Sequence, residues 1–311
     1  MDSVNRTIVD RMHSPVEMIP QLASYIVSSG GKRLRPLLTL ATARLLGYGG
    51  DAHVGLAATV EFIHTATLLH DDVVDESALR RGQASANELF GNQASVLVGD
   101  FLFARAFELM VEGESLDILR ILSRASAVIA EGEVLQLSAQ HDVATTESTY
   151  MQVIESKTAQ LFAAACEVGA VIAGADETAR DNLRRYGLSL GLAFQLVDDV
   201  LDYSAEQARL GKRVGDDFAE GKVTLPVILA FEAGDETEKA FWRRTMQDQD
   251  IRDGDLAHAQ MLLGRHGTLD AAMARAGTIA TEAVGLLEAA PDGPIRDALA
   301  GVLTFVVDRD Y

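Results

Sequence analysis

The sequence contains little cysteine, proline and positive charge, and each shortage narrows the possible structures. Cys166 is the only cysteine among 311 residues, which excludes an internal disulfide and a cysteine-rich zinc site. Only 6 prolines occur, and this scarcity favours long helices. The 27 lysine and arginine residues face 46 aspartate and glutamate residues, for a net charge of −19. This charge argues against nucleic acid or an anionic membrane surface as the main partner.

Long apolar runs are missing as well. No stretch of about 18 uninterrupted apolar residues occurs, so no transmembrane segment is expected. Residues 1–6 lack a basic region followed by an apolar run, so no signal peptide is expected there. These observations predict a cytoplasmic protein. The hydrophobic content of 48% is enough for a large core.

Helical periodicity dominates the chain, and no strand-like alternation, linker or short repeat is found. The sequence therefore predicts an all-α fold, with one domain over residues 1–311 built as a helical bundle around a central cavity. Shorter, more charged helices over 235–311 are interpreted as structural. The longer helices are expected over 1–12, 15–28, 34–46, 54–76, 85–111, 115–140, 146–173 and 176–206, with a further one beginning near 226.

Two matched acidic segments are the most informative feature. Each has the pattern Asp-Asp-x-x-Asp at the end of an apolar helix, at 71–75 and at 198–202. Residues four apart share a helix face, so Asp71 lies over Asp75 and Asp198 over Asp202. Such carboxylates repel each other unless cations compensate them. Two such clusters predict two walls of one cavity, with Mg²⁺ and a diphosphate between them.

The acidic segments are also compatible with two alternatives to a magnesium-diphosphate site. Each segment alone could be a solvated acidic helix end, although the presence of two matched segments disfavours this alternative. A di-iron bundle is disfavoured because such bundles use Glu and Glu-x-x-His, whereas the two acidic segments offer Asp without a histidine in that spacing.

Localised cations stand out in so acidic a chain. Lys32 and Arg35 lie three residues apart beside a Gly-Gly turn, and Arg80 and Arg81 follow the first acidic segment. Arginine binds phosphate oxygens in a bidentate manner and lysine as a point charge. The alternative for Arg80 is that it only neutralises a nearby aspartate. His64, taken alone, is compatible with a core histidine.

Together these residues resemble the trans-polyprenyl diphosphate synthases, over about two thirds of the chain. No motif residue is missing, and the run 61–69 is most similar to octaprenyl and decaprenyl synthases. The matching pieces, in family order around the two Asp-rich motifs, are Gly-Gly-Lys-Arg-Leu-Arg-Pro at 30–36, Ile-His-Thr-Ala-Thr-Leu-Leu-His at 63–70, Arg-Arg-Gly at 80–82, Val-Gly-Asp at 98–100, Glu-Gly-Glu at 131–133, Lys-Thr at 157–158, Gly-Asp-Asp at 215–217 and Glu-Gly-Lys at 220–222.

The resemblance implies an isoprenoid synthase-type bundle and Mg²⁺-dependent head-to-tail condensation of isopentenyl diphosphate with an allylic diphosphate, such as farnesyl or geranylgeranyl diphosphate. It implies three Mg²⁺ ions, held by Asp71, Asp75 and Asp198 with Asp202 near. It further implies a metal-free isopentenyl pocket of Lys32, Arg35, His64 and Arg81. Arg80, Lys157, Lys212 and Lys222 would contact the allylic diphosphate, and Thr158 and Gln195 the reacting carbons.

Product length is expected to depend on Ala66 and Thr67, one turn before Asp71. Aromatic residues there shorten the products of the family, whereas these two leave the tunnel open. The sequence therefore predicts a product of eight to ten isoprene units (C40–C50) for quinone side chains. Four deeper residues are candidate plugs for the tunnel instead: Phe101, Phe103, Phe107 and Leu135.

Three alternatives stay open. They are a synthase of shorter products (C15–C20), a class I terpene synthase, and a non-catalytic regulatory subunit. The second diphosphate pocket disfavours a terpene synthase, and two complete Asp-rich motifs disfavour a regulatory subunit. The resemblance also implies a homodimer, with the apolar helix 85–111 as candidate interface, and product release through transient membrane contact is a further hypothesis.

Overall fold

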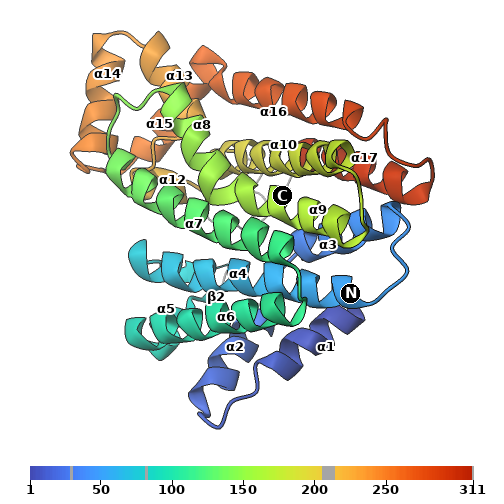
Figure 1. Cartoon of the computed structure of the whole chain (residues 1–311). Coiled ribbons are helices and arrows are strands. Elements are labelled where there is room, and N and C mark those ends of the chain that lie inside the picture. The colour runs from blue at the N-terminus through green and yellow to red at the C-terminus, as the bar shows by residue number, and fades with distance from the viewer. Residues whose placement is uncertain (29–30, 81–82, 205–213, 310–311) are drawn as a thin grey trace. The chain divides into compact units, whose positions relative to one another are not determined.

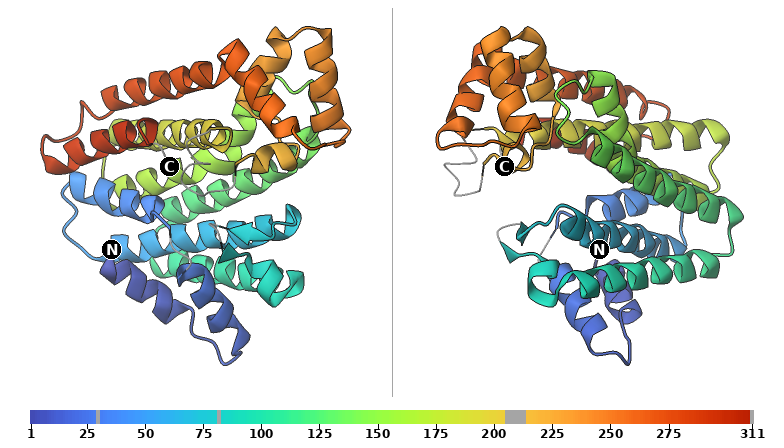
Figure 2. Two further views of the ribbon diagram at one scale, coloured as in Figure 1. Left: turned by 180° about the vertical axis from the view of Figure 1, so that it is seen from behind. Right: turned by 90° about the vertical axis from the view of Figure 1, so that its left-hand side faces the viewer.

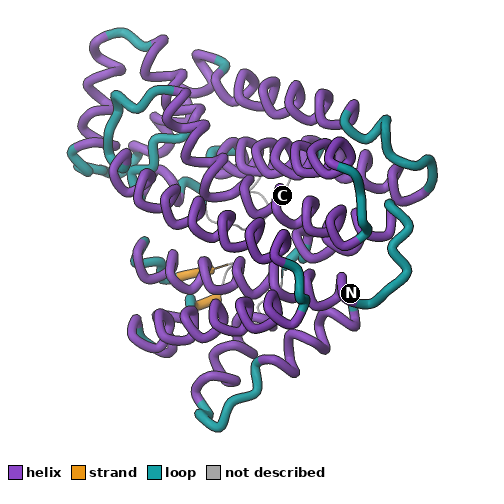
Figure 3. Tube along the Cα trace, viewed as in Figure 1, coloured by secondary structure: helices purple, strands orange, loops and turns teal. Residues whose placement is uncertain are grey.

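The computed structural model describes residues 1–28, 31–80, 83–204 and 214–309, and it is almost entirely helical (Figures 1 and 3). The chain forms two compact units. Unit 1 comprises Met1–Ser126, Leu161–Arg184 and Ala289–Ile295, and unit 2 comprises Ala127–Gln160, Arg185–Glu288 and Arg296–Tyr311. Each unit is described by itself below.

Unit 1 is organised around helix α4, which packs against α6, α3 and α1. The first part of the chain runs in order through these helices and through the short pair of strands that follows α4 (Figure 2). The elements are α1 (Asp2–Arg11), α2 (Met18–Ser28), α3 (Leu34–Leu45), α4 (Ala52–Val74), β1 (Leu79–Arg80), β2 (Gln83–Ala84), α5 (Ala86–Phe90), α6 (Asn92–Glu112) and the start of α7 (Leu116–Ala139).

Among the described residues, α4 is the one helix long and apolar enough to cross a membrane by length and composition. However, 67% of its most apolar window is buried inside the protein. Its buried residues, such as Leu56, Phe62 and Ile63, are the apolar positions that its packing against three helices requires. We therefore interpret α4 as the core helix of unit 1.

Unit 2 gathers a second core around Trp242, Tyr203 and Phe218, with partly buried Phe231 and Phe241 packed against it. Its helix α7 begins in unit 1, as do α10 (Glu177–Asp202) and α17 (Pro294–Val307), whereas α9 (Gln160–Ile172) lies in unit 1 apart from Gln160. The elements that follow α7 are α8 (Glu147–Ile154), a π-helical turn η1 (Glu155–Ala159), α9 (Gln160–Ile172), α10 (Glu177–Asp202), α12 (Asp216–Ala219), α13 (Leu225–Ala233), α14 (Glu236–Trp242), a second π-helical turn η2 (Arg243–Gln247), α15 (Asp255–His266), α16 (Thr268–Gly285) and α17 (Pro294–Val307).

The all-α prediction is confirmed, with four local corrections. The helix expected over 85–111 is broken at Gly91, whose φ of 84° is readily adopted only by glycine. The helix expected over 146–173 contains a π-helical turn at its centre. The helix expected to begin at 15 begins at Met18. The loop expected after the first acidic segment is an antiparallel hairpin that pairs Leu79 with Ala84.

Helices α3 and α9 approach closely because Gly169 has no side chain. A Cβ atom there would lie 2.0 Å from Thr42 Oγ1 and 2.8 Å from the carbonyl oxygen of Thr39. We therefore expect Gly169→Ala to lower the free energy of unfolding by about 1–3 kcal/mol, the usual cost of overpacking. Urea denaturation measures this.

Gly277 on α16 is the matched control, because nothing lies within 4 Å of a Cβ atom added there. Gly277→Ala should be neutral or stabilising by up to about 1 kcal/mol, since alanine restricts the unfolded chain. Equal effects of the two substitutions would contradict the packing described for Gly169.

Candidate functional site

The first Asp-rich motif lies in unit 1, where α4 ends. Asp71 is in the last turn, and the backbone N–H of Asp75 donates to its carbonyl oxygen at 2.8 Å. Both side chains are half-buried. Carboxylates at a helix C-terminus meet the negative end of the helix dipole and are unfavourable there. The position of Asp71 and Asp75 therefore favours binding of a cation.

Asp72 differs from its neighbours, because its side chain is fully buried. Arg80 on β1 donates from Nε to Asp72 Oδ1 at 2.7 Å, and its terminal nitrogen lies 2.6 Å from the same oxygen. In this structure Arg80 thus neutralises a nearby aspartate, as the alternative interpretation of this residue expected. Its predicted contact with the allylic diphosphate stays a prediction. Arg81 lies outside the described residues.

Two of the residues predicted for the isopentenyl pocket, Arg35 and His64, are in contact in unit 1, and a third, Lys32, lies near them in sequence. Arg35 Nη1 lies 3.2 Å from His64 Nε2, and the Arg35 guanidinium lies 4.2 Å from the ring centroid of Phe162. Lys32 is exposed, three residues before Arg35. Between them Arg33 has a left-handed backbone (φ 48°) and pairs with the buried carboxylate of Glu61. Arg33 was not predicted as a site residue, and its ion pair holds the turn that carries Lys32.

The second Asp-rich motif ends α10 in unit 2. The Asp198 side chain is 43% exposed, whereas Asp199 is buried. The backbone N–H groups of Asp216 and Asp217 lie 3.3 and 3.1 Å from the Asp202 carboxylate oxygens. Burial is the main cause that raises the pKa of Asp199 to about 7 and of Asp202 to about 6, and it also raises the pKa of Asp217. Each of these groups would be easier to ionise beside a cation.

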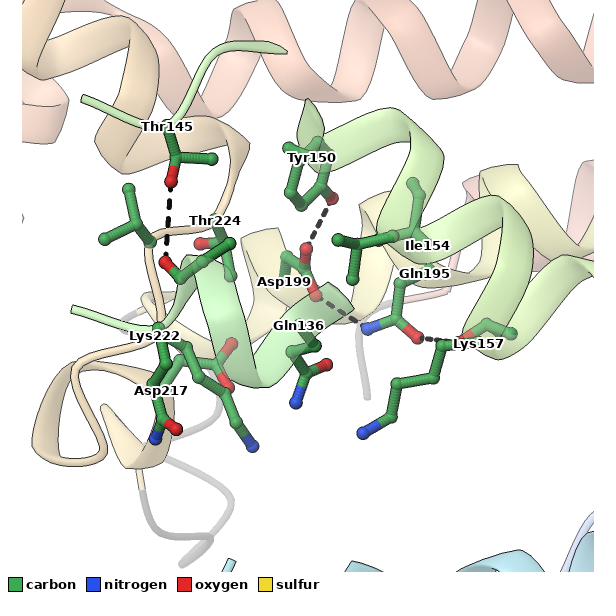
Figure 4. Close-up of a pocket in the computed structure, with 15 residues that line it drawn as sticks. Gln136, Thr145, Tyr150, Ile154, Lys157, Gln195, Asp199, Asp217, Lys222 and Thr224 are labelled. Carbon is green, nitrogen blue, oxygen red and sulfur yellow. Dashed lines mark hydrogen bonds between the residues drawn. The ribbon is translucent and has the colours of Figure 1, made fainter. Parts of the chain in front are cut away.

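A cavity of about 140 Å³ lies next to this motif within unit 2 (Figure 4). Four predicted site residues line it, namely Lys157, Thr158, Gln195 and Lys222. The two lysines are held by neighbouring carboxylates, at 2.7 Å for Lys157 with Glu133 and 2.6 Å for Lys222 with Glu220. Lys212 lies outside the described residues.

A chain of hydrogen bonds crosses the cavity wall (Figure 4). Thr158 Oγ1 donates to Gln195 Oε1 at 2.9 Å, and Gln195 Nε2 donates to Asp199 Oδ1 at 2.7 Å. Tyr150 donates from its hydroxyl to Asp199 Oδ2 at 2.5 Å. The π-helical turn carries Lys157 and Thr158, and such turns are frequent at functional sites. Thr158 and Gln195, 37 residues apart in sequence, are thereby brought together.

Sequence reasoning missed three residues of unit 2. Tyr150 and Asp217 line the cavity. Arg309, in the region interpreted as structural, contacts Asp198 at 2.5 Å. A tyrosine inside a helical pattern carries no signal of its role. Asp217 had one, because it belongs to the Gly-Asp-Asp motif.

The hydrogen bond of Tyr150 gives a pH-dependent prediction. Burial places the pKa of Asp199 at about 7, so this carboxyl is largely ionised at pH 8.5 and neutral at pH 5.5. A hydrogen bond to a charged acceptor is worth about 1.5–3 kcal/mol, and one to a neutral acceptor about 0.5–1.5 kcal/mol. Tyr150→Phe should therefore destabilise the protein more at pH 8.5 than at pH 5.5, as measured by urea denaturation in EDTA.

Tyr186→Phe is the control, since the buried Tyr186 donates to a neutral acceptor, the Leu299 carbonyl oxygen, at 2.7 Å. Its cost should not change between the two pH values. The contribution of Asp199 to the stability of the wild-type protein should itself fall as the pH rises from about 4 to about 7, because the folded pKa of Asp199 lies above its ordinary value. A pH-independent cost of Tyr150→Phe would contradict this description of Asp199.

The residues present fit hard divalent cations. Mg²⁺ takes oxygen ligands and is usually held by one or two carboxylates plus phosphate oxygens. Asp71 with Asp75, and Asp198 with Asp202, each supply carboxylates that are not fully buried. Over the ranges that the structure describes, no group of three or more His, Cys, Asp or Glu side chains is arranged as a complete metal site. Carboxylates in pairs suit a metal that completes its coordination with substrate oxygens.

Known proteins are similar to this chain over its full length. The family model described as polyprenyl synthetase matches residues 16–263. The octaprenyl diphosphate synthase of Escherichia coli is 49% identical, over 100% of this chain and 96% of that protein. The crystal structure of a decaprenyl diphosphate synthase from Rhodobacter capsulatus has a TM-score of 0.96 at 53% identity, over 100% of this chain and 96% of that one.

A second crystal structure, of a polyprenyl synthase from Caulobacter crescentus complexed with calcium and isoprenyl diphosphate, has a TM-score of 0.96 at 52% identity. The match covers 100% of this chain and 95% of that one. The chain belongs to the polyprenyl synthetase family and has its all-α isoprenoid synthase fold.

Proposed function

We propose that this protein condenses isopentenyl diphosphate head to tail with an allylic diphosphate, and so makes an all-trans polyprenyl diphosphate of eight to ten isoprene units. The full-length similarity to octaprenyl and decaprenyl diphosphate synthases supports the reaction and the product class. The observation that carries the proposal is the pair of Asp-rich helix ends, at Asp71–Asp75 and at Asp198–Asp202, each in a position that favours cations.

The acidic residues hold the leaving group in this proposal. Asp71, Asp75 and Asp198 bind Mg²⁺, three ions in total, with Asp202 near. When bound, Mg²⁺ acts as a Lewis acid that stabilises the negative charge of the departing diphosphate. The Caulobacter relative complexed with calcium and isoprenyl diphosphate supports divalent-metal binding of this kind.

The lysines of the cavity wall assist the same step. Lys157 and Lys222 are paired with Glu133 and Glu220, and in the proposed reaction they donate to the allylic diphosphate instead. Arg80 and Lys212 have the same proposed role. These cations stabilise charge as it develops on the diphosphate, and electrostatic stabilisation of this kind is usually the largest single contribution to catalysis.

Isopentenyl diphosphate binds to the basic group of Lys32, Arg35, His64 and Arg81. The guanidinium of Arg35 is held between His64 and the Phe162 ring, so little entropy is lost when it binds phosphate oxygens. Binding there orients the isopentenyl double bond toward C1 of the allylic substrate. Thr158 and Gln195, which are hydrogen-bonded to each other, lie beside the reacting carbons.

The charge balance of the condensation requires one proton to leave. The allylic C1–O bond breaks and its electron pair goes to the diphosphate, while the isopentenyl double bond forms the new C–C bond to C1. The resulting cation loses a proton to the departing diphosphate. No histidine is therefore needed as a general base, and His64 serves in binding.

The alternatives are less well supported. A class I terpene synthase has no use for the second diphosphate site at Lys32 and Arg35. A regulatory subunit is disfavoured because both Asp-rich motifs are complete. A shorter product is the main alternative, and it differs only in the residues that limit the tail.

We also propose one functional domain over residues 1–311 and a homodimer. The first rests on α7 and α10, which each contribute residues to both units. The second rests on apolar residues of α6 that are exposed in the single chain, including Leu97 at 67% and Val111 at 64%, because exposed apolar patches mark interfaces. Release of the apolar product at a membrane surface, from a cytoplasmic enzyme, completes the proposal.

The decisive experiment is a product analysis. Purified protein is incubated with Mg²⁺, farnesyl diphosphate and labelled isopentenyl diphosphate, and the products are separated by length. The proposal expects products of eight to ten isoprene units and none in EDTA. Absence of isopentenyl incorporation would overturn the proposed reaction, and a ladder that stops at C15 or C20 would overturn the long product.

A further inference from the structure

Arg309 places a buried positive charge against the second Asp-rich motif. It follows α17, and its side chain is only 2% exposed. Its Nη2 lies 2.5 Å from Asp198 Oδ1 and 2.8 Å from the Phe194 carbonyl oxygen. The guanidinium also lies 4.1 Å from the ring centroid of Phe194. These contacts all lie within unit 2 and give the guanidinium a defined position.

The two partners differ sharply in exposure. The Asp198 side chain is 43% exposed, against 2% for Arg309. Arg309 therefore contacts Asp198 from the protein interior, and the carboxylate retains access to solvent. An ion can approach Asp198 without displacing Arg309.

Stability does not explain this pair. Burying a guanidinium is costly, and buried ion pairs are often no more stabilising than apolar residues of similar volume. Burial lowers the pKa of Arg309 despite the nearby Asp198, and Arg309 Nε is buried without a hydrogen-bond partner. A charge retained at such cost next to a proposed metal ligand points to a role in metal binding.

We propose that Arg309 is a fixed counter-charge that weakens divalent-cation binding at Asp198, so that this carboxylate binds metal tightly only together with a diphosphate. The inference rests on the proposed function, which makes Asp198 a metal ligand. Asp199, Asp202 and Asp217 add further carboxylates nearby, as their mutual electrostatic effects show. The charge of Arg309 offsets part of the negative charge that these carboxylates present to a divalent ion.

Charge outweighs orientation in this arrangement. The Arg309 guanidinium repels a divalent ion bound at the neighbouring Asp198. Even at the dielectric constant of water, repulsion between such close charges changes affinity on the order of tenfold, and a neutral residue in place of Arg309 would remove it. The same substitution would also leave the Asp198 side chain less well oriented. Because aspartate has few rotamers, this loss changes metal affinity less than the removal of the charge does. We therefore expect tighter metal binding when the charge is removed.

The test measures Mn²⁺ binding by the whole protein, by calorimetry and by the electron paramagnetic resonance of free Mn²⁺, without substrate. Arg309→Gln, which keeps hydrogen-bond donors but loses the charge, should bind Mn²⁺ about tenfold more tightly at one site than wild type. Arg309→Lys keeps the charge and should remain within about threefold of wild type. Addition of inorganic pyrophosphate should strengthen binding by wild type more than by Arg309→Gln.

Two controls make the result specific. Arg275→Gln on α16 changes the net charge equally, but Arg275 pairs with Glu147 at 2.8 Å, so Mn²⁺ affinity should be unchanged. In the double variant Arg309→Gln/Asp198→Asn the gain should disappear. Thermal unfolding of each variant shows that it is folded, and Arg309→Met supplies a second neutral variant if Arg309→Gln is not.

Unchanged or weaker Mn²⁺ binding in a folded neutral variant would overturn the proposal. A gain that persists without Asp198, or that equals the effect of Arg275→Gln, would overturn it too. The measurement uses no prenyl substrate, so its failure is distinguishable from failure of the proposed reaction, which the product analysis tests separately.

Discussion

Asp71→Ala is expected to abolish the condensation, with a loss in kcat/KM on the order of 10³-fold or more. Asp71 is a proposed metal ligand in the last turn of α4, so its removal leaves the charge of the departing diphosphate less compensated. Its side chain is half-buried, and the helix continues past it through the backbone hydrogen bond from Asp75. Fold stability should therefore change little, and isopentenyl incorporation in an Mg²⁺ titration measures the loss.

Asp117→Ala is the matched control. The Asp117 side chain is 49% exposed on α7 and pairs with Arg120 on the surface, and surface pairs contribute little. This substitution also removes one aspartate carboxylate, but a carboxylate that has no proposed role in catalysis. Activity of Asp71→Ala above about one tenth of wild type, in a folded variant, would show that Asp71 is not essential and would contradict the proposed metal site.

Thr67→Phe is expected to shorten the product while it leaves the first condensation intact. Thr67 lies four residues before Asp71 on α4, which corresponds to about 6 Å along the helix, close to one isoprene unit. The structure favours Thr67 over Ala66 for this test. Thr67 is half-buried, whereas Ala66 is completely buried, so phenylalanine at 66 would overpack the core at a cost of about 1–3 kcal/mol.

Product length after incubation with farnesyl diphosphate measures the effect. The products of Thr67→Phe should end at least about two isoprene units below those of wild type, because the ring would occupy the path of the tail. Thr67→Ser is the control and should leave product length unchanged, since it retains the hydroxyl that donates to the His64 carbonyl oxygen at 2.8 Å. If Thr67→Phe and wild type give products of the same length, this position on α4 does not limit the length of the product.

In that case Phe103 becomes the next candidate. It lies on α6 and stacks with His70, with ring centroids 6.2 Å apart. His70 immediately precedes Asp71 in sequence, so Phe103 is tied to the end of α4 that carries the acidic motif. The tunnel limit would then depend on α6, which packs against α4.

The sequence by itself determined the features that depend on local spacing. Helix periodicity and scarce proline predicted an all-α fold, and the helix limits at 34–46 and 115–140 differ from the observed ones by one residue. The two Asp-rich motifs were evident because each occupies five consecutive residues. The family resemblance placed Arg35 and His64 in one predicted pocket, and the structure shows that the two side chains are in contact.

Only the tertiary structure decided which neighbours these residues contact. Asp71 and Asp72 are adjacent and chemically identical, yet one is half-buried and the other is fully buried against Arg80. Asp199 accepts a hydrogen bond from Tyr150, 49 residues away in sequence, and Asp198 accepts one from Arg309, 111 residues away. Such contacts depend on how helices pack, and packing combines side chains from many distant positions. No local pattern of residues predicts these long-range contacts, whereas a motif of five consecutive residues on one helix can be recognised directly in the sequence.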